Sequence, residues 1–526
     1  MSTQPIDPAE ETDSDWRPAF NPWFITVVVA LAAFMEILDT SIANVALPHI
    51  AGSLGATNDE STWVLTSYLT SNAIVLPMSG WLANMFGRKR FFMLCLALFT
   101  ASSVLCGLST SLGMLIFFRI LQGIGGGALQ PLSQAILADT FPHRMRAMAF
   151  AVFGITAVVA PALGPTLGGW ITDNFSWPWI FFINLPVGLL TLVLLARVLE
   201  DPPFLRRQQT AGVKVDYLGI AFLTLGVGAL QVFLDKGQQN DWLASPFIVT
   251  LMAISVVCLT ALAVWEWFQK DPVVEVRLLR NPNVLTANLM MFAAGIIMFS
   301  CIVLMPMFLQ TLMGYDATTA GLVLSGAACQ FFILMPFTAW LNGKVQGRII
   351  VAAGWIAMAA SMIVSTMQMN LQLSFSRATW LLMFQQAGIA LVLIPVMVLA
   401  FIGIPPEKNN AVSSLLNFMR NIGSSVGTSM VATLLARRAQ TYQVQLTAHT
   451  TIFDPRVQAL LQGFSERLGG EKQALTALYR ILQAQAAVLA YVDLYRILGA
   501  LAIAMVISAV LLKKNKPGEE ASVGIH

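Results

Sequence analysis

The stretch "AAFMEILDTSIANVALP", residues 32–48, decides the fold class of this chain. Its apolar residues are typical of a membrane-spanning helix, yet two carboxylates, Glu36 and Asp39, lie near its middle. A charged side chain at the centre of a bilayer costs about 2.5–3.5 kcal/mol, so lipid is an unfavourable neighbour for either residue. The two residues are three positions apart and share one helix face. That face must therefore look into the interior of a helix bundle or into a wet cavity.

The composition of the whole chain agrees with a membrane protein. Of its 526 residues, 57% are hydrophobic and only 11% are charged, whereas a soluble protein carries roughly 25% charged residues. The apolar residues fall in runs of about 20, the length that crosses about 30 Å of hydrocarbon. We therefore expect an all-α polytopic membrane protein.

Fourteen apolar runs between polar breaks are interpreted as membrane spans. They are expected at residues 24–47, 62–85, 91–109, 113–138, 146–172, 179–198, 216–234, 246–268, 284–312, 318–341, 348–368, 379–403, 410–436 and 487–512. An even number of spans places both termini on the same side of the membrane.

The distribution of Lys and Arg predicts which side that is. Nineteen of these residues fall in segments on the side of the termini, and only Lys236 and Arg377 fall in the short loops of the other side. Because short loops rich in Lys and Arg stay in the cytoplasm, both termini are expected there. The long segment 437–486 is not counted, since long loops cross the membrane largely regardless of charge.

The spans also predict the domain organisation. We expect a cytoplasmic N-terminal tail (1–21), an N-terminal six-helix bundle (22–198), two additional membrane helices with linkers (199–283), a C-terminal six-helix bundle (284–512) and a cytoplasmic C-terminal tail (513–526). The first tail is acidic and lacks the basic start of a signal peptide.

The segment 437–486, inside the C-terminal bundle, is expected outside the membrane as two amphipathic helices broken at Gly469 and Gly470. Two readings stay open for this segment: a packed cap on the outer face, or a docking surface for another protein.

Two glycine patterns indicate an internal repeat. The fifth span contains "GITAVVAPALGPTLGGW" and the thirteenth contains "NFMRNIGSSVGTSM", each with glycines four residues apart. This spacing lets helices approach closely. The two spans hold corresponding places in a six-plus-two-plus-six arrangement, and repeated bundles are typical of transporters.

With these features, the chain resembles the major facilitator superfamily, and within it the fourteen-span drug/proton antiporters of the EmrB/QacA type, closest to the EmrB branch. The resemblance rests on motifs in order along nearly the whole chain: "LDTSIANVALP" (38–48), "GWLANMFGRKR" (80–90), "FFRILQGIGGGA" (117–128), "GPTLGG" (164–169), "FFINLPVG" (181–188) and "PPEKNNAVSSLLNFMRNIGSSVG" (405–427). One position departs from the family pattern, because Asn84 stands where the loop motif usually carries an aspartate.

The resemblance implies a major facilitator fold and a proton-coupled multidrug efflux transporter of the bacterial inner membrane, of the kind that causes antibiotic resistance. Such a protein exports small apolar or cationic drug-like compounds through the lipid bilayer by alternating access. It uses protons and the proton motive force in place of a cofactor, and it needs neither a metal nor nucleic acid. The EmrB-like outer segment further implies a periplasmic adaptor protein and an outer-membrane channel as partners.

Two alternatives stay open at this point. One is a dedicated proton-coupled exporter of a native metabolite or fatty acid, and the other is a non-transporting scaffold subunit. The buried charges argue against a scaffold, which has no reason to bear their cost. The chain has no phosphate-binding GxxxxGK[ST] loop and no large soluble region, so we expect neither an ATP-driven pump nor an enzyme.

The proton-coupling residues are expected to be Asp39, Glu36 and Arg119. Burial and a like-charged neighbour both favour the protonated form of a carboxyl group, so one of the pair is expected to exchange a proton near neutral pH. The resemblance assigns the shared acidic position to Asp39 and the fourth-span arginine to Arg119. Purely structural roles stay open: Asp39 as a hydrogen-bond acceptor, and Arg119 as a static charge partner.

The substrate-binding candidates, chosen by helix position, are Glu36, Phe34, Trp63, Tyr68 and Gln122. Gln130 and Gln134 are placed on the same helix as Gln122.

The candidates for gating and structural motifs lie in three places. They are Gly80, Gly87 and Arg88 in the basic inner loop, Gly164, Pro165, Gly168 and Gly169 in the fifth span, and Arg420 in the thirteenth. The glycines and proline are expected to bend the fifth helix and pack it closely. Arg420 is expected to extend towards the cytoplasmic face, unless it acts in a gate.

Overall fold

The apolar runs form long helices in the computed structural model, which describes residues 18–202, 215–450, 454–468, 470–510 and 512. The helices of the first half are α2 (Pro22–Leu54), α3 (Asn58–Ser61), α4 (Trp63–Phe86), α5 (Arg88–Gly107), α6 (Leu112–Gly126), α7 (Leu129–Thr140), α8 (His143–Asn174), α9 (Trp179–Phe182) and α10 (Asn184–Val198). Two more, α12 (Tyr217–Lys236) and α13 (Pro246–Phe268), follow. The rest are α14 (Pro282–Thr311), α15 (Ala317–Cys329), α16 (Phe331–Asn342), α17 (Gly347–Gln368), α18 (Phe375–Ala400), α19 (Asn409–His449), α20 (Pro455–Leu468) and α21 (Glu471–Ala509). The described ranges contain no strand, so the all-α prediction is confirmed for them.

Among the residues that the structure describes, twelve stretches of helix are long and apolar enough to cross a membrane. They coincide with twelve of the fourteen predicted spans. The other two predicted spans, 62–85 and 410–436, coincide with α4 and α19, which are helical over that length but carry many Ser, Thr and Asn side chains. The count of fourteen therefore stays a prediction.

Three predicted spans are interrupted where the sequence suggests continuous helices. The fourth is divided at residues 127–128, the sixth at Ile183 and the tenth at Gln330. At the first break the chain passes very close to its neighbours: a Cβ added to Gly125 would lie 2.6 Å from the Phe99 backbone nitrogen, and one on Gly127 would lie 2.6 Å from the Asn72 carbonyl oxygen. Gln122 therefore belongs to α6, whereas Gln130 and Gln134 belong to α7, which corrects the expectation of one shared helix.

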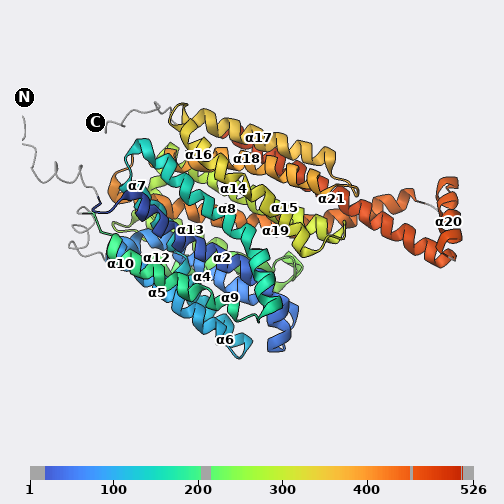
Figure 1. Ribbon diagram of the computed structural model, residues 1–526, viewed down its shortest axis with the longest axis horizontal. Helices are drawn as coiled ribbons and strands as arrows, with labels where there is room; N and C mark the ends of the chain where they lie inside the picture. Colours follow the sequence, from blue (N-terminus) through green and yellow to red (C-terminus); the bar gives the residue numbers. More distant parts are fainter. Residues whose placement is uncertain (1–17, 203–214, 451–453, 469, 511, 513–526) are drawn as a thin grey trace, which may run out of the picture.

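The segment expected as an outer loop is largely a continuation of its flanking helices. α19 runs without a break to His449, and α21 already begins at Glu471. The predicted break at Gly469 and Gly470 lies between α20 and α21, and Gly469 itself is outside the described residues. Figure 1 shows α20 at the end of this extension, beyond the other helices. The expectation of two separate amphipathic helices is wrong for the second, because α21 is one helix through the last apolar run.

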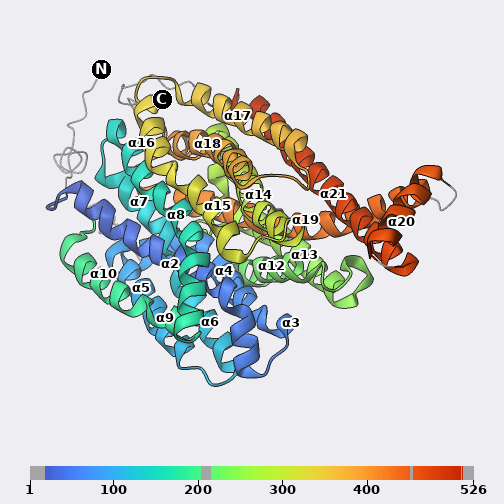
Figure 2. The same cartoon turned by 45° about the vertical axis from the view of Figure 1, so that its right-hand side comes forward.

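The helices lie side by side in two groups (Figures 1 and 2). In the first group, α2 packs chiefly on α8, α4 packs on α6, and α5 packs on both α6 and α10. In the second, α14 packs on α19, and α17 packs on α18 and α21. The groups meet where α4 and α7 contact α19 and where α8 contacts α15, α16 and α18. α12 packs on α4 and α19, whereas α13 packs mainly on α12.

The contact of α14 with α19 depends on glycines noted in the sequence. A Cβ on Gly423 would lie 2.2 Å from the Phe292 carbonyl oxygen, and one on Gly427 would lie 2.6 Å from that of Ile296. The absence of side chains at these two positions lets the helix backbones touch, as the small-residue spacing predicts. The tails 1–17 and 513–526 and the linker 203–214 lie outside the described residues.

Candidate functional site

The helix α2 carries both carboxylates of the opening stretch into the interior. Glu36 is 5% exposed and Asp39 is 2% exposed. The α-helix turns by about 100° per residue, so positions three apart lie on neighbouring lines of one face. The two side chains have different partners, which divides the site into two hydrogen-bond networks.

The Asp39 network is an ion pair inside the first group of helices. Arg119 Nη1 on α6 donates to Asp39 Oδ2 at 2.7 Å. The other oxygen, Oδ1, accepts from Gln122 Nε2 at 2.9 Å and from Asn184 Nδ2 on α10 at 2.6 Å. Asn184 also donates to Ser103 Oγ at 2.9 Å. The carboxylate therefore has three donors, which compensate for its removal from water.

Arg119 is fully buried, and its hydrogen bonds are made through Nε and Nη1. Its Nε donates to the Val64 carbonyl oxygen at 3.1 Å, and its Nη1 also donates to Gln122 Oε1 at 2.8 Å. The guanidinium lies over the Tyr68 ring, with its carbon 4.2 Å from the ring centroid. A cation over an aromatic face is stabilised by about 0.5–2 kcal/mol. The sequence predicts an acceptor for Arg119, and the structure places Asp39 in that position.

The Glu36 network has neutral donors. Oε1 accepts from the Tyr68 hydroxyl at 3.2 Å and from Asn72 Nδ2 at 3.1 Å, both on α4. Oε2 accepts from Gln130 Nε2 on α7 at 2.6 Å. Gln130 in turn accepts a hydrogen bond, through its Oε1, from Arg420 Nη2 on α19. The network thus reaches from α2 into the second group of helices.

The Arg420 side chain contacts α7, and its expected extension towards the cytoplasmic face stays a prediction. Besides Gln130, its Nη2 contacts Asn417 Oδ1 at 3.1 Å. Asn417 and Gln134 exchange two side-chain hydrogen bonds, at 2.6 and 3.2 Å. One acceptor, Gln130, is on α7 and the other is on the helix of Arg420 itself; both compensate the cation, because an unpaired cation between helices is costly.

The substrate-binding candidates separate into two sets. Tyr68 and Gln122 contact the carboxylates, as described above. Phe34 packs instead on a hydrophobic cluster that includes Leu38 and Ile42. Trp63 lies near the start of α4, where Lys236 Nζ is 5.2 Å from its ring centroid. Helix position alone does not distinguish these surroundings, and the binding roles of all five stay predictions.

The basic inner loop joins the two groups of helices at one end. Gly87, the residue before α5, has φ +87°, a backbone conformation that residues with side chains rarely adopt. The Arg88 guanidinium pairs with Asp139 at the end of α7, with both side chains nearly fully buried. Asp139 also accepts from Asn409 Nδ2 at 2.5 Å. Arg88 thus contacts, through one carboxylate, the first residue of α19.

Two other contacts reinforce this junction. A Cβ on Gly80 would lie 3.0–3.1 Å from the backbone of Asn410 and Ala411, so α4 and α19 are in close contact there. Asn84, where the family usually has an aspartate, accepts from Asn410 Nδ2 at 2.9 Å. The carboxylate that contacts α19 at this junction is that of Asp139.

The glycine and proline motif of α8 packs against α2. Pro165 has no N–H, so the carbonyl of residue 161 four positions earlier loses its helical partner. Ser41 Oγ on α2 donates to that Pro161 carbonyl oxygen at 3.1 Å. A Cβ on Gly164 would lie 2.1 Å from the same Ser41 Oγ, whereas one on Gly169 would meet nothing within 4 Å. A Cβ on Gly168 would lie 3.2 Å from Ile42, a distance between these two cases.

Sequence reasoning missed several residues of the site. Asn184 lies in the quoted "FFINLPVG" motif, and Asn72 lies in an apolar run. The signal in both cases is an amide side chain inside a predicted span, where it needs a partner. Asp139 gave less signal because it stands at the end of its span.

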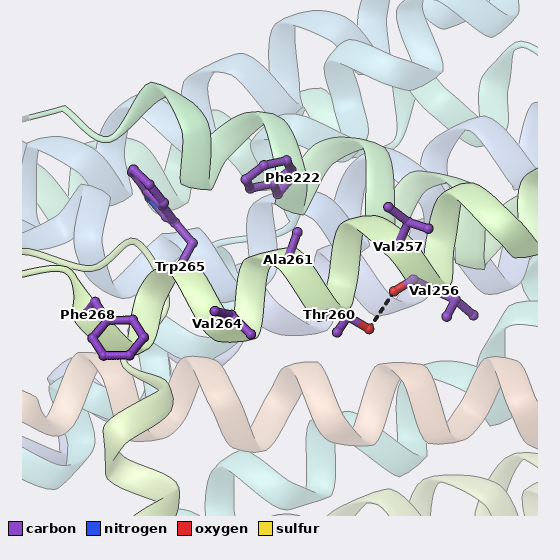
Figure 3. A pocket seen from close by; sticks show the side chains of 8 residues that line it. All are labelled: Phe222, Val256, Val257, Thr260, Ala261, Val264, Trp265 and Phe268. Atoms are coloured by element: carbon purple, nitrogen blue, oxygen red, sulfur yellow. Dashed lines mark hydrogen bonds between the residues drawn. The ribbon is translucent and has the colours of Figure 1, made fainter.

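A surface groove of about 740 Å³ lies away from these networks, on α12 and α13. Its lining residues are Phe222, Val256, Val257, Thr260, Ala261, Val264, Trp265 and Phe268. Figure 3 shows them in a row along α13, opposite Phe222. None of the predicted site residues is among them, so this groove is separate from the buried carboxylates.

Comparison with known proteins places the chain among transporters. The Major Facilitator Superfamily profile matches residues 29–428. The "Probable multidrug resistance protein EmrY" of Escherichia coli (strain K12) is 36% identical over 503 residues, which cover 94% of this chain and 95% of that protein. The "Multidrug export protein EmrB" of the same strain is 37% identical over 436 residues (83% and 84%). The "Fatty acid resistance protein FarB" of Neisseria gonorrhoeae is 34% identical over 452 residues (86% and 88%).

A solved structure supports the fold alone. The proton:xylose symporter XylE has a TM-score of 0.55 and 16% identity, with 91% of this chain and 96% of that chain covered. The described helices thus have the arrangement of a major facilitator fold.

Proposed function

Because this chain belongs to the major facilitator superfamily, we propose that it is a multidrug efflux transporter of the bacterial inner membrane that exchanges its substrates for protons. The observation that carries the proposal is the buried ionisable cluster of Glu36, Asp39 and Arg119, each at most 5% exposed. Buried charges in membrane spans are costly, and a transporter that carries protons has a use for them. The relatives named for multidrug export support the substrate class.

The mechanism follows from the arrangement of the two groups of helices. One group carries the carboxylates, and α19 of the other contacts it at Gln130, Gln134 and Asp139. Substrate bound from the cytoplasm and protons bound from outside each favour a different relative position of the groups. The proton gradient then drives export as the groups rock past each other. The nineteen-to-two distribution of Lys and Arg supports cytoplasmic termini.

The first experiment is transport by the purified protein in proteoliposomes. With an imposed pH gradient, we expect uptake or efflux of several chemically unrelated cationic and apolar dyes, and none after a protonophore dissipates the gradient. A fatty acid belongs in the same panel, because the relative FarB is named for fatty acid resistance. Transport of the fatty acid alone would favour a dedicated exporter, and transport that ignores the gradient would refute proton exchange.

The outer extension supports a partner outside the membrane. α19, α20 and α21 project beyond the other helices (Figure 1), and α20 and its neighbours expose apolar side chains such as Val444 (71%) and Leu460 (52%). Contiguous patches of exposed apolar residues are typical of protein–protein contacts. We infer a periplasmic adaptor there, which would lead to an outer-membrane channel.

Deleting residues 445–480 tests the adaptor separately from transport. We expect the shortened protein to keep proton-driven dye transport in proteoliposomes, because the deletion spares both carboxylate networks. Cells that carry it are expected to lose most of their resistance to exported drugs. Resistance equal to the full chain, at equal expression, would argue against the adaptor.

A further inference from the structure

The two carboxylates of α2 differ in which helices their contacts reach. Asp39 and its ion-pair partner Arg119 make their described hydrogen bonds within the first group of helices, to α4, α6 and α10. Glu36 is connected through Gln130 to Arg420 of α19, in the second group. The groups must move relative to each other in any alternating-access cycle. The Glu36 connection is therefore one that such a motion has to make and break.

Gln130 holds this connection through both ends of its amide. Its Nε2 donates to Glu36 Oε2 at 2.6 Å, and its Oε1 accepts from the Arg420 guanidinium. An ionised carboxylate on one side and a cation on the other both require this amide orientation. Consecutive hydrogen bonds of this kind polarise and strengthen one another.

We propose that Gln130 is a positioning residue that transmits the charge of Glu36 to Arg420, so that proton binding at Glu36 loosens the contact between α7 and α19. The inference rests on the proposed proton exchange and identifies how one of its carboxylates acts on the other half of the protein. Gln130 bears no charge and takes up no proton.

The physical reason is the balance of charge along the hydrogen-bonded series Glu36, Gln130 and Arg420. While Glu36 is ionised, Arg420 has a counter-charge one amide away. A proton on Glu36 removes that charge and gives the carboxyl group an O–H donor, which competes with Arg420 for Gln130 Oε1. Arg420 then keeps only Asn417, on its own helix, as its described partner. A poorly compensated cation between helices favours separation of the helices.

Other charged groups near Glu36 do not substitute for this path. Tyr68 of α4 is the titratable group that contacts Glu36 directly, through a neutral hydroxyl. Asp39, three residues along the same helix, is already paired with Arg119 of α6. From α7 the contacting group is the Gln130 amide, and from α19 the facing charge is Arg420.

The chain supplies a matched control in Gln134, one turn along α7. It also joins α7 to α19, through two hydrogen bonds with Asn417, but it contacts neither Glu36 nor Arg420 in the described hydrogen bonds. Gln134→Ala thus removes a contact between the same two helices and leaves the hydrogen bonds of Gln130 with Glu36 and Arg420 in place; it changes only Asn417, the second acceptor of Arg420.

The test measures proton-driven dye transport by Gln130→Ala, Gln134→Ala and the full-length wild type over a range of pH values. It also measures hydrogen–deuterium exchange of residues 409–436 over the same range. For the wild type we expect the protection of α19, after correction for the pH dependence of intrinsic amide exchange, to decrease as the pH falls. Couplings between sites typically change an equilibrium about 5- to 150-fold, so the shift should be well resolved. In Gln130→Ala, the amides of α19 should exchange fast at every pH, and the transport rate should not depend on pH. The variant should still bind dye.

In Gln134→Ala, the amides of α19 are expected to exchange faster than in the wild type. The pH dependence of both exchange and transport should stay that of the wild type. Arg420→Lys retains the cation and should keep part of that dependence, whereas Arg420→Gln should lose it. The inference is overturned if the transport rate of Gln130→Ala depends on pH as that of the wild type does. It is also overturned if the transport rate of Gln134→Ala is as independent of pH as that expected for Gln130→Ala. Either result leaves the proposed proton exchange intact. Wild-type protein without any proton-driven transport would refute the proposed function itself, and protection of α19 that is independent of pH would then refute the inference as well.

Discussion

Asp39→Asn is expected to abolish proton-driven transport, with at least about a 100-fold loss of rate, a barrier increase of nearly 3 kcal/mol. The variant leaves the fully buried Arg119 without its counter-ion, and breaking a buried pair by removing one partner costs about 3–5 kcal/mol of stability. It also removes a carboxylate that accepts from Arg119, Gln122 and Asn184. The measurements are dye flux in proteoliposomes and thermal unfolding in detergent.

A double variant separates stability from function. Asp39→Asn combined with Arg119→Gln removes both charges, so we expect it to regain most of the lost stability but none of the coupled transport. Recovery of both would mean that Asp39 only compensates Arg119. Undiminished coupled flux in the single variant would remove Asp39 from the transport mechanism altogether.

Gly164→Ala is expected to destabilise the protein and slow transport more than any other single-methyl change in the α8 motif. The added Cβ would lie 2.1 Å from Ser41 Oγ and 2.4 Å from Ser41 Cβ, and 3.1 Å from the Ser41 carbonyl carbon. Rotation of the hydroxyl alone cannot relieve these contacts, so α8 and α2 must separate. Overpacking of this kind typically costs about 1–3 kcal/mol, and here it shifts the helix that carries Glu36 and Asp39.

Gly169→Ala is the matched control, because a Cβ there meets nothing within 4 Å. It should leave the melting temperature and the flux close to those of the wild type. Ser41→Gly combined with Gly164→Ala removes the colliding side chain and should recover part of the stability. Equal behaviour of the two alanine variants would show that close packing at Gly164 does not matter.

The sequence predicts most of the helices, because membrane spans must be apolar over about 20 residues. Hydropathy is less informative for α4 and α19, which carry Ser, Thr and Asn side chains into contacts with other helices. Ser79 on α4 and Ser414 on α19, for example, lie with their hydroxyl oxygens 2.8 Å apart. Sequence reasoning also missed the end of α19 at His449, since a helix leaving the membrane loses its apolar signal.

The candidate site, like the helices, could be predicted only in part from the sequence. Glu36, Asp39 and Arg119 are recognisable from the sequence because each is costly in a span. Their partners are not, since Gln130 and Arg420 are 290 positions apart and only the packing of α7 on α19 brings them together. Phe34 and Trp63 could not be separated from Tyr68, because an aromatic residue in a span fits a core, a lipid contact and a binding site equally well.

The unbroken length of α19 has a mechanical consequence. Its 41 residues form a rod of about 60 Å at about 1.5 Å per residue. One end is fastened to Asp139 through Asn409, and the other leaves the bundle towards α20. If the rod pivots near Asn409, a tilt of about 5° moves its far end by roughly 5 Å over that length. The helix is thus a lever, and α20 is expected to sweep through several ångströms in every transport cycle.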